Sequence, residues 1–404
     1  MNNVAGIDVS KGKSMVSVLR PFGEVLAKPF SIGHTGSELK ELADYLKSLD
    51  GETRVVMEHT GRYYEPVARF LHEEGIFVSA VNPKLVKDYG NNTLRKVKTD
   101  KADARKIARY GLDNWMELRQ HTPMDTIRMQ LKTLNRQQGL YSKMKTMMKN
   151  NLIALLDQTY PGVNSLFDSP VREDGSQKWV DFAASFWHVD CVRSMSLAAF
   201  TERYRKWCKR HGYNFSQSRA IEVHTKAQDL IAMLPRDALT KTMIRQAIDA
   251  LNAVSASLER LKNEMRTLAA QLPEYPVVMA MRGVGNSLGP QLMAELGDVT
   301  RFTHRNAITA FAGVDPGADQ SGTHEAKSTR ASKSGPPELR KALFLLMDCL
   351  LKTMPSDDPV YRFMDKKRAE GKPYLVYMTA GANKFLRIYY GRVKEYLASL
   401  ESAD

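Results

Sequence analysis

Four acidic residues in the first quarter of the chain have the type and spacing of metal ligands. Asp8 interrupts the first apolar, β-prone stretch, and Glu58 ends another one. Asp100 and Asp103 are three residues apart at the start of a helical pattern, so they share one helix face. Taken singly, each is an ordinary acid at a strand end or in the first turn of a helix, where the helix dipole favours it. Taken together, they are carboxylates of the kind that bind Mg²⁺.

The surroundings of the acid pair are strongly basic. Segment 84–110 carries nine Lys or Arg against three acids, a net charge of +6. Carboxylates that hold a metal ion inside a basic surface suit chemistry on phosphate, because lysines and arginines hold the polyanion. The whole chain of 404 residues has a net charge of +14 and a pI of about 9.5, which also indicates a nucleic-acid partner.

Composition limits the class of protein. With 404 residues, the chain can form two or three domains, and its 43% hydrophobic content is typical of ordered globular protein. No apolar run approaches the roughly 18 residues of a membrane span, and the N-terminus does not resemble a signal peptide. The three widely spaced cysteines indicate reduced thiols and argue against a zinc site. We therefore expect a soluble, cytoplasmic protein.

The acids must be positioned by an α/β domain. Strands are expected at 3–9, 14–20, 25–31, 53–58 and 76–81, and helices at 36–49, 64–74 and 100–110. Thr99 is the expected N-cap of the last helix. This order predicts a mixed sheet with helices, and ligand sites in open α/β sheets gather at strand ends.

An Asp on the first strand, a Glu on the fourth and a following D-x-x-D helix resemble the RNase H/RuvC-like nuclease fold. In that fold four acids hold two metal ions that activate a nucleophile and stabilise a leaving oxygen. The resemblance implies that Asp8, Glu58, Asp100 and Asp103 bind Mg²⁺, with two ions per site.

The middle of the chain has the sevenfold spacing of a coiled coil. In 243–272 the steps between apolar residues alternate three and four over four heptads. In 122–157 the apolar residues at sevenfold spacing are Ile127, Leu134, Tyr141, Met148 and Leu155. Three arrangements are open. The two segments pair within one chain, they pair between two subunits, or their apolar residues form the buried stripe of a single-chain helical bundle. Between these segments, 158–235 is a helical and aromatic insertion, whose His188, His211 and His224 we interpret as structural or surface residues.

Two motifs of the C-terminal part suggest phosphate binding. The GVG at 283–285 lies between apolar helical segments, and it is either a helix-hairpin-helix turn or a plain packing turn. After Gly313 comes a polar loop of some twenty residues with hydroxyls among lysines and arginines, followed by a helix from about 337. Long loops of this kind are usually functional. This one is either a basic phosphate-binding loop or the carrier of a serine nucleophile, which needs activation.

In this order the motifs resemble the DEDD transposases and recombinases of bacterial insertion sequences, the IS110 family, which is related to the Piv-type DNA invertases. The resemblance covers roughly 1–157 and 240–395. It is carried by GIDVSK, MEHTGRYYEPVA, VNP, KTDKADA, RGVG, RFTHRNAITAFAGVDP, QSGT and SKSGPPELRKAL. The architecture it implies is an RuvC-like catalytic domain at 1–115, a coiled-coil region at 116–272 with the insertion at 158–235, and a serine-bearing transposase domain at 273–404.

The family resemblance also implies a mechanism. Ser321 is the expected nucleophile, forming a phosphoserine link to DNA that a free 3′-hydroxyl later attacks, and Ser332 is the competing nucleophile. The implied partners are donor and target DNA, a noncoding guide RNA from the element, and further copies of the chain in a dimer of dimers with composite sites. The enzyme would act in the bacterial cytoplasm, at the nucleoid. The residues expected to contact nucleic acid are Lys11, Arg95, Lys98, Lys101, Arg105, Arg282, Gly283, Gly285, Lys327, Arg330, Ser332 and Lys333.

Other classes of protein remain open from the residues alone. An RuvC-like nuclease that hydrolyses junctions with water, or an invertase that reads DNA without RNA, would need the four acids. A sugar-kinase or actin-type ATPase also begins with a G-I-D-V-S-like strand, but it needs later glycine-rich phosphate loops that this sequence lacks. A non-catalytic nucleic-acid-binding protein would tolerate loss of Asp8.

Overall fold

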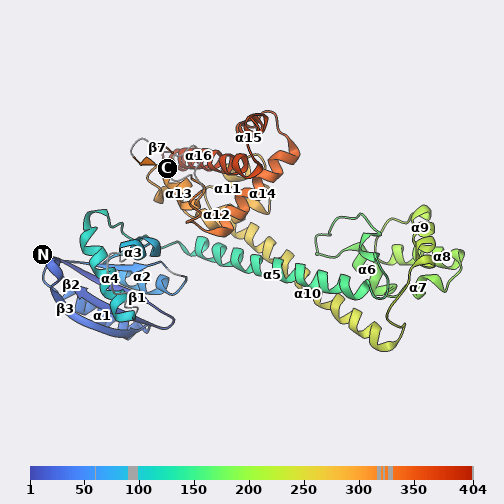
Figure 1. Cartoon of the computed structure of the whole chain (residues 1–404), viewed down its shortest axis with the longest axis horizontal. Coiled ribbons are helices and arrows are strands. Elements are labelled where there is room, and N and C mark those ends of the chain that lie inside the picture. Colours follow the sequence, from blue (N-terminus) through green and yellow to red (C-terminus); the bar gives the residue numbers. More distant parts are fainter. Residues whose placement is uncertain (60, 90–98, 316–319, 322–323, 326–330, 403–404) are drawn as a thin grey trace. The chain divides into compact units, whose positions relative to one another are not determined.

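The computed structural model describes residues 1–59, 61–89, 99–315, 320–321, 324–325 and 331–402. The chain divides into two compact units, Met1–Met124 and Asp125–Asp404, and each is described by itself (Figure 1).

The first unit is built on a five-stranded mixed sheet with the order β3-β2-β1-β4-β5. The strands are β1 (Asn2–Val9), β2 (Lys13–Leu19), β3 (Val25–Gly33), β4 (Glu52–Glu58) and β5 (Phe77–Val81). The pairs β1–β2 and β2–β3 are antiparallel, whereas β4 pairs parallel to β1 and β5 pairs parallel to β4. All five strands were predicted from the alternation and β-propensity of their residues.

Helices cover both faces of this sheet. They are α1 (Gly36–Lys47), α2 (Tyr64–Glu73), α3 (Pro83–Tyr89) and α4 (Asp100–Asp113). One face packs Ala5 and Ile7 of β1 with Leu39 of α1 and Val67 of α2. The opposite face packs apolar residues of β1 and β4 with α4. Strand order, strand directions and helix placement are those of an RNase H-like domain, as the resemblance predicted.

The second unit contains a long helix pair, α5 (Thr126–Leu156) and α10 (Ala238–Ala269), which pack along each other within one chain (Figure 1). The structure therefore shows an intrachain pairing of the two heptad segments. The buried line of α5 differs from the predicted one. The sevenfold set that includes Leu134 and Tyr141 is only partly buried, while Leu131, Asn135 and Gln138 are buried. The buried residues Leu131, Gln138 and Leu152 keep a sevenfold spacing, but their line lies four residues after the predicted one. The buried side also includes Asn135, which donates a hydrogen bond to the buried Glu295 carboxylate.

The insertion folds as a helical subdomain at one end of this helix pair. Its helices are α6 (Lys178–Ser185), α7 (Asp190–Arg193), α8 (Leu197–Arg210) and α9 (Gln217–Asp229). Its core is aromatic, with Phe182, Phe186 and Trp207 in edge and stacked contacts. The same core includes residues at the facing ends of α5 and α10.

The C-terminal part surrounds a separate apolar core that includes the other end of the helix pair. Its elements are α11 (Tyr275–Met279), α12 (Leu288–Leu296), α13 (Arg305–Ala312), the short strands β6 (Gln320–Ser321) and β7 (His324–Glu325), α14 (Pro337–Thr353), α15 (Pro359–Ala369) and α16 (Tyr374–Glu401). The helix expected from about 337 begins at Pro337. In the described part of the chain, no helix combines the length and apolar character that crossing a membrane requires.

Candidate active site

Strand register places Asp8 and Glu58 side by side. In the parallel ladder between β1 and β4, Ile7 is the partner of Met57, and the two acids are the next residue on each strand. Side chains alternate between the faces of a sheet. Ile7 and Met57 lie in the core beneath α1 and α2. Asp8 and Glu58 therefore belong to the opposite face, which is the one that α4 covers.

Helix α4 brings the acid pair to the same face. Thr99 caps the helix, since its hydroxyl accepts a hydrogen bond from the Ala102 N–H, which confirms the predicted start. The helix lies directly on β1 at Gly6, where a Cβ atom would be 2.3 Å from both the Ala104 carbonyl oxygen and the Ala108 nitrogen. Only glycine permits this approach. The first turn of α4, with Asp100 and Asp103, consequently starts close to the ends of β1 and β4.

The electrostatics show that these carboxylates act on one another. Burial, followed by the charges of Asp103 and Asp100, raises the pKa of Asp8 from 3.8 to about 6. Burial and the charges of Asp8 and Asp103 raise the pKa of Glu58, and the Lys106 ammonium partly opposes this rise. Like charges held together disfavour ionisation, and a divalent cation relieves that repulsion.

The four acids are close enough to repel one another without converging on a single point. Among the residues that the structure describes, no three His, Cys, Asp or Glu side chains are placed to hold one ion together. Asp8 and Glu58 are half-buried, and Asp100 is exposed at the helix start. The donor set is entirely carboxylate oxygen, which fits a hard cation such as Mg²⁺.

Basic residues predicted to hold nucleic acid lie on the surface near these elements. Lys11 follows β1, and Lys101 and Arg105 are on α4; all three are exposed. Arg95 and Lys98 lie outside the described residues. Sequence reasoning did not single out Lys106, which influences Glu58. Its spacing of three residues from Asp103, on the same helix face, was the available signal.

The hydroxyl-rich loop has its two ends fixed against each other. The backbone N–H of Lys333 donates to the Gly313 carbonyl, and that of Ser332 donates to the Asp315 carbonyl, both at 3.1 Å. A Cβ at Gly335 would clash with the Phe311 carbonyl oxygen, so the backbone after the loop directly contacts the end of α13 before it. These contacts close the loop that contains Ser321.

The two candidate serines differ in what the structure shows of them. The backbone of Ser321 belongs to β6, which pairs with β7 through His324. The Ser332 hydroxyl donates to the Asp315 carboxylate at 3.2 Å and lies 3.0 Å from the Ser334 hydroxyl. Lys333 has a positive φ of 53°. Lys327 and Arg330 lie outside the described residues.

The GVG turn joins α11 to α12. Gly283 has a φ of 76°, and a Cβ there would be 2.9 Å from a methyl of Leu346, so this glycine is required for packing. Gly285 faces open space. The exposed Arg282 guanidinium pairs with Asp357 at 2.9 Å. Arg282 and Gly283 line a hollow of about 430 Å³.

A second hollow, of about 420 Å³, was not predicted from the sequence. Its lining includes Arg305 of α13 with Lys384 and Arg387 of α16. No acidic residue lines it in the described part of the chain. The three cations come from two helices far apart in the sequence, and no local pattern marks them as neighbours.

Comparison with known proteins identifies the family. A family model described as a transposase, the DEDD transposase of IS110, matches residues 5–161. A second, described as the transposase IS116/IS110/IS902 family, matches residues 275–361. The first match contains all four acids, and the second contains the GVG turn and both candidate serines. Together they cover more than half of the chain.

The similar curated proteins and solved structures share 22% or less of their sequence with this chain. The chain is 22% identical over 344 residues to the pilin gene-inverting proteins of Moraxella bovis and Moraxella lacunata, covering 84% of this chain and 80% of each relative. It is also similar to the structure of T. thermophilus RuvC in complex with Holliday junction substrate, with a TM-score of 0.23 and 16% identity, over 29% of this chain and 96% of RuvC. A second Thermus thermophilus RuvC structure gives a TM-score of 0.22 and 18% identity, over 28% of this chain and 96% of RuvC.

The fold is assigned from strand order and helix placement in the first unit, and the activity from the two family models and the gene-inverting relatives. The chain belongs to the IS116/IS110/IS902 family of transposases and is a DNA-recombining enzyme.

Proposed function

We propose that this transposase cuts and rejoins DNA at a divalent-metal site formed by Asp8, Glu58, Asp100 and Asp103, with Ser321 as the nucleophile. The observation that supports the proposal best is the placement of Asp8 and Glu58 at adjacent positions of β1 and β4, on the face covered by α4. The raised pKa values of Asp8 and Glu58 also support it, because a bound cation would relieve the repulsion between these carboxylates.

The four acids would hold Mg²⁺, with two ions per site as in related folds. Bound metal would supply positive charge that stabilises the attacking and leaving oxygens of the phosphoryl transfer. The protein's part is to hold the carboxylates on a rigid sheet and helix. Lys106 would limit the net negative charge around Glu58.

The serine step is a balanced transesterification. The Ser321 hydroxyl loses its proton and attacks the phosphorus, the bond from phosphorus to the 3′-oxygen breaks, and that oxygen leaves as a protonated 3′-hydroxyl. In the second step a 3′-hydroxyl attacks the phosphoserine, restores a phosphodiester and releases the serine hydroxyl. Each bond broken is replaced by one of the same kind, so the reaction needs no ATP. The backbone hydrogen bonds from Lys333 to Gly313 and from Ser332 to Asp315 hold the two ends of this segment together, which supports a role for it as one unit.

The experiment that tests this proposal is trapping of a covalent protein–DNA adduct. We expect an adduct with the unchanged enzyme and Mg²⁺, none with Ser321→Ala or with Asp8→Asn, and a reduced amount with Ser332→Ala. An adduct that persists in Ser321→Ala and disappears in Ser332→Ala would transfer the nucleophile to Ser332. Strand cleavage by Ser321→Ala without an adduct would favour hydrolysis by water.

The regions of the chain would divide the work. The acids at 1–115 would supply metal-dependent catalysis, the helices of 116–272 would form the coiled-coil region with its insertion, and 273–404 would supply the serine. The residues proposed to contact nucleic acid are the twelve named from the sequence, with Ser332 and Lys333 on phosphate. The enzyme would act in the bacterial cytoplasm, at the nucleoid.

We also propose a homo-oligomer, a dimer of dimers with sites shared between subunits. The acids and the serine belong to two separately packed units, which supports such sharing. Mixing Asp8→Asn subunits with Ser321→Ala subunits should restore adduct formation, because a shared site would combine intact acids with an intact serine. A mixture as inactive as its components would contradict sharing.

Substrate choice is proposed to depend on a noncoding guide RNA that pairs with donor and target DNA. The chain's net charge of +14 supports binding of more than one nucleic acid. The gene-inverting relatives favour a second candidate, an invertase that reads DNA directly. Sequencing the RNA that co-purifies from cells carrying the native flanking DNA separates the two. One defined RNA from beside the gene supports guidance, whereas recombination without such RNA supports the invertase.

A further inference from the structure

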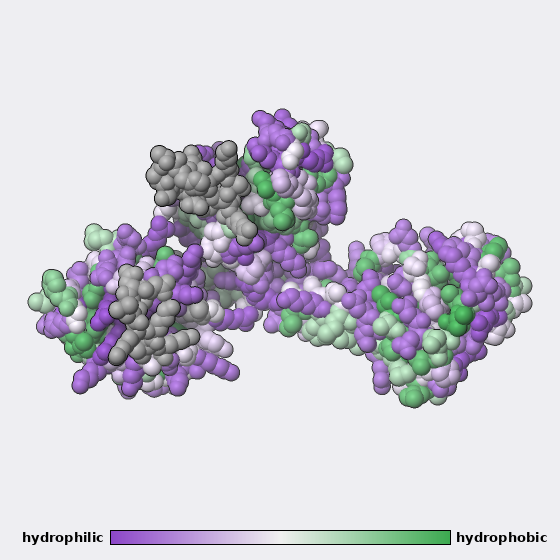
Figure 2. All heavy atoms as spheres, viewed as in Figure 1, coloured by the Kyte–Doolittle hydropathy of each residue, from purple (hydrophilic) through white to green (hydrophobic). Residues whose placement is uncertain are grey.

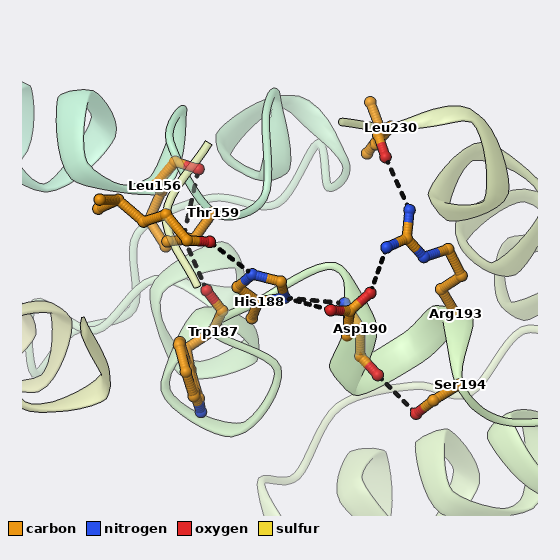
Figure 3. Close-up of polar contacts among 9 residues, drawn as sticks. Leu156, Thr159, Trp187, His188, Asp190, Arg193, Ser194 and Leu230 are labelled. Carbon is orange, nitrogen blue, oxygen red and sulfur yellow. Dashed lines mark hydrogen bonds and ion pairs between the residues drawn. The ribbon is translucent and has the colours of Figure 1, made fainter. Parts of the chain in front are cut away.

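The insertion at 158–235 is firmly joined to the end of the helix pair. The Gln158 carbonyl, at the entry of the insertion, accepts hydrogen bonds from the backbone N–H groups of Met233 and Leu234 at its exit, at 2.8 and 3.0 Å. The Thr159 hydroxyl donates to the Trp187 carbonyl (Figure 3). The buried His188 ring lies 3.1 Å from the Leu234 carbonyl oxygen. These bonds hold both connections together, so the subdomain has a fixed place at this end.

Helix α8 has two faces of opposite character. Phe200, Tyr204, Trp207 and Cys208 are buried in the aromatic core of the subdomain. The other face is exposed and carries five cations against one acid; it consists of Glu202, Arg203, Arg205, Lys206, Lys209 and Arg210. We call these six residues the α8 outer face. Hydrophilic residues cover much of the surface in the region of α8 and α9 (Figure 2).

The cations of the α8 outer face are weakly paired compared with those of the neighbouring helix α9. On α9, Glu222 pairs with Arg219 at 2.7 Å and with Lys226 at 2.8 Å. On α8, the single acid Glu202 lies 3.7 Å from Lys206 and 4.0 Å from Arg205. Across the described ranges, Lys209 and Arg210 have no acidic partner.

The stability of the helix does not explain this pattern. The helix dipole favours Lys209 and Arg210 in the last turn, but Arg203 and Arg205 are too far from the C-terminus to benefit. Lys206 is three or four residues from Arg203, Lys209 and Arg210, a spacing at which like charges repel. Like charges gathered on one helix face cost stability in the free protein. A negatively charged polymer that binds to this face would neutralise them, and that explains why the cations lie together.

We propose that the α8 outer face binds the phosphate backbone of duplex DNA. Arg203 to Arg210 span about 10 Å along the helix, enough to meet a few phosphates of one strand. The aromatic residues of α8 are all buried, so this face offers no stacking platform for single-stranded bases. DNA is the polyanion that a transposase must hold. The inference rests on the charges of the α8 outer face and on the family membership, and it needs neither the metal site nor the Ser321 nucleophile of the proposed function.

The test uses the full chain and measures DNA affinity without chemistry. Binding to a labelled duplex of about 30 base pairs is followed in EDTA over a salt series, for the unchanged chain and for the triple variant Lys206→Ala/Lys209→Ala/Arg210→Ala. We expect the slope of log affinity against log salt to become shallower by about 2 to 3, since each phosphate contact contributes about 0.9. Affinity near physiological salt should fall by about tenfold.

Two controls separate contact from net charge. Lys40→Ala/Lys47→Ala/Arg69→Ala removes the same charge from cations that already pair with Glu74 or Glu73, and it should leave the slope unchanged. Lys206→Arg/Lys209→Arg/Arg210→Lys keeps the charge of the α8 outer face and should bind as the unchanged chain does. Circular dichroism checks that each variant is folded.

Three results would overturn the proposal. One is an unchanged slope and affinity in the α8 triple variant. Another is an equal loss in the paired-cation control, which would make net charge the cause. The third is a loss confined to a hairpin RNA of matched length, which would assign the face to RNA. Because the assay excludes metal, a failure of the acid site or of Ser321 cannot produce any of them.

Discussion

Folding places the Asp8 carboxylate in an unfavourable environment, half-buried beside other acids. Its pKa is about 6 in the folded chain against 3.8 without these neighbours. A raised carboxylate pKa means that the folded state is favoured at low pH. The contribution is fully present below about pH 3.8, is lost as the pH rises to about 6, and changes little above that.

Asp8→Asn should remove this pH dependence. In EDTA the variant should unfold a few degrees higher than the unchanged chain at neutral pH, while DNA cleavage in Mg²⁺ should be lost. Thermal unfolding between about pH 4.5 and about pH 7.5 measures the difference. Asp44→Asn, which changes an exposed acid on α1, is the control and should behave like the unchanged chain. Identical pH curves for Asp8→Asn and the unchanged chain would contradict the raised pKa.

At the scale of elements, the close contact between β1 and α4 decides where the D-x-x-D turn lies. Gly6→Ala would put a methyl 2.3 Å from the backbone of α4 and force the helix away. We expect a loss of about 1–3 kcal/mol in the free energy of unfolding, as for other overpacked sites. Cleavage should fall more than the folded fraction does, because Asp103 moves with the helix.

The matched control for Gly6 is Gly36→Ala. A Cβ at Gly36 meets open space at the start of α1, so this substitution should be neutral or slightly stabilising. Chemical denaturation and the cleavage rate per folded molecule measure both effects. Full activity in Gly6→Ala would show that the β1–α4 contact does not position the acids.

A buried polar cluster connects α5 to the C-terminal helices. Glu295 of α12 is buried, accepts a hydrogen bond from Asn135 at 2.6 Å and pairs with Arg136 at 2.9 Å. Arg136 also pairs with Glu338 of α14. Burial raises the pKa of Glu295, and the Arg136 charge and the Asn135 hydrogen bond counteract that rise.

Arg136→Ala should destabilise the second unit by about 3 kcal/mol, because it leaves a buried carboxylate without its cation. Adding Glu295→Gln should recover part of this loss, since the amide oxygen can still accept from Asn135. Arg260→Ala, on the exposed side of α10, should change stability little. Urea denaturation of the four proteins gives the comparison. Equal stability of Arg136→Ala and Arg260→Ala would mean that Glu295 is not charged in the fold.

At the scale of the whole molecule, the acids and the serine-bearing loop belong to units with separate cores. A ligand that binds only folded protein stabilises the unit that holds it, by about 2.7 kcal/mol at a concentration 100-fold above its dissociation constant. Mg²⁺ should therefore raise only the calorimetric transition of the first unit, and EDTA should reverse the shift. Asp8→Asn should reduce the shift, and an equal shift of both transitions would place metal outside the four acids.

The strands and the start of α4 could be predicted from local sequence signals. Alternating apolar residues marked the five strands, and Thr99 with its acidic first turn marked the start of α4, because strand alternation and helix capping act between near neighbours. The buried line of α5 was missed. Asn135 is buried because Glu295, far along the chain, provides its partner, and a hydrophobic pattern does not contain that information.

The sequence by itself determined the family, through the order of motifs that its members share, and it predicted metal-dependent chemistry from four carboxylates and a basic surface. The tertiary structure decided which of these residues lie close together. Strand register places Asp8 next to Glu58, and the absence of a side chain at Gly6 allows α4, with Asp103, to pack against β1. It also decided that the two heptad segments pair within one chain and that the insertion presents one face of α8 to solvent. Such contacts join residues distant in the chain, and packing and hydrogen bonding between surfaces select them, which local propensity does not encode.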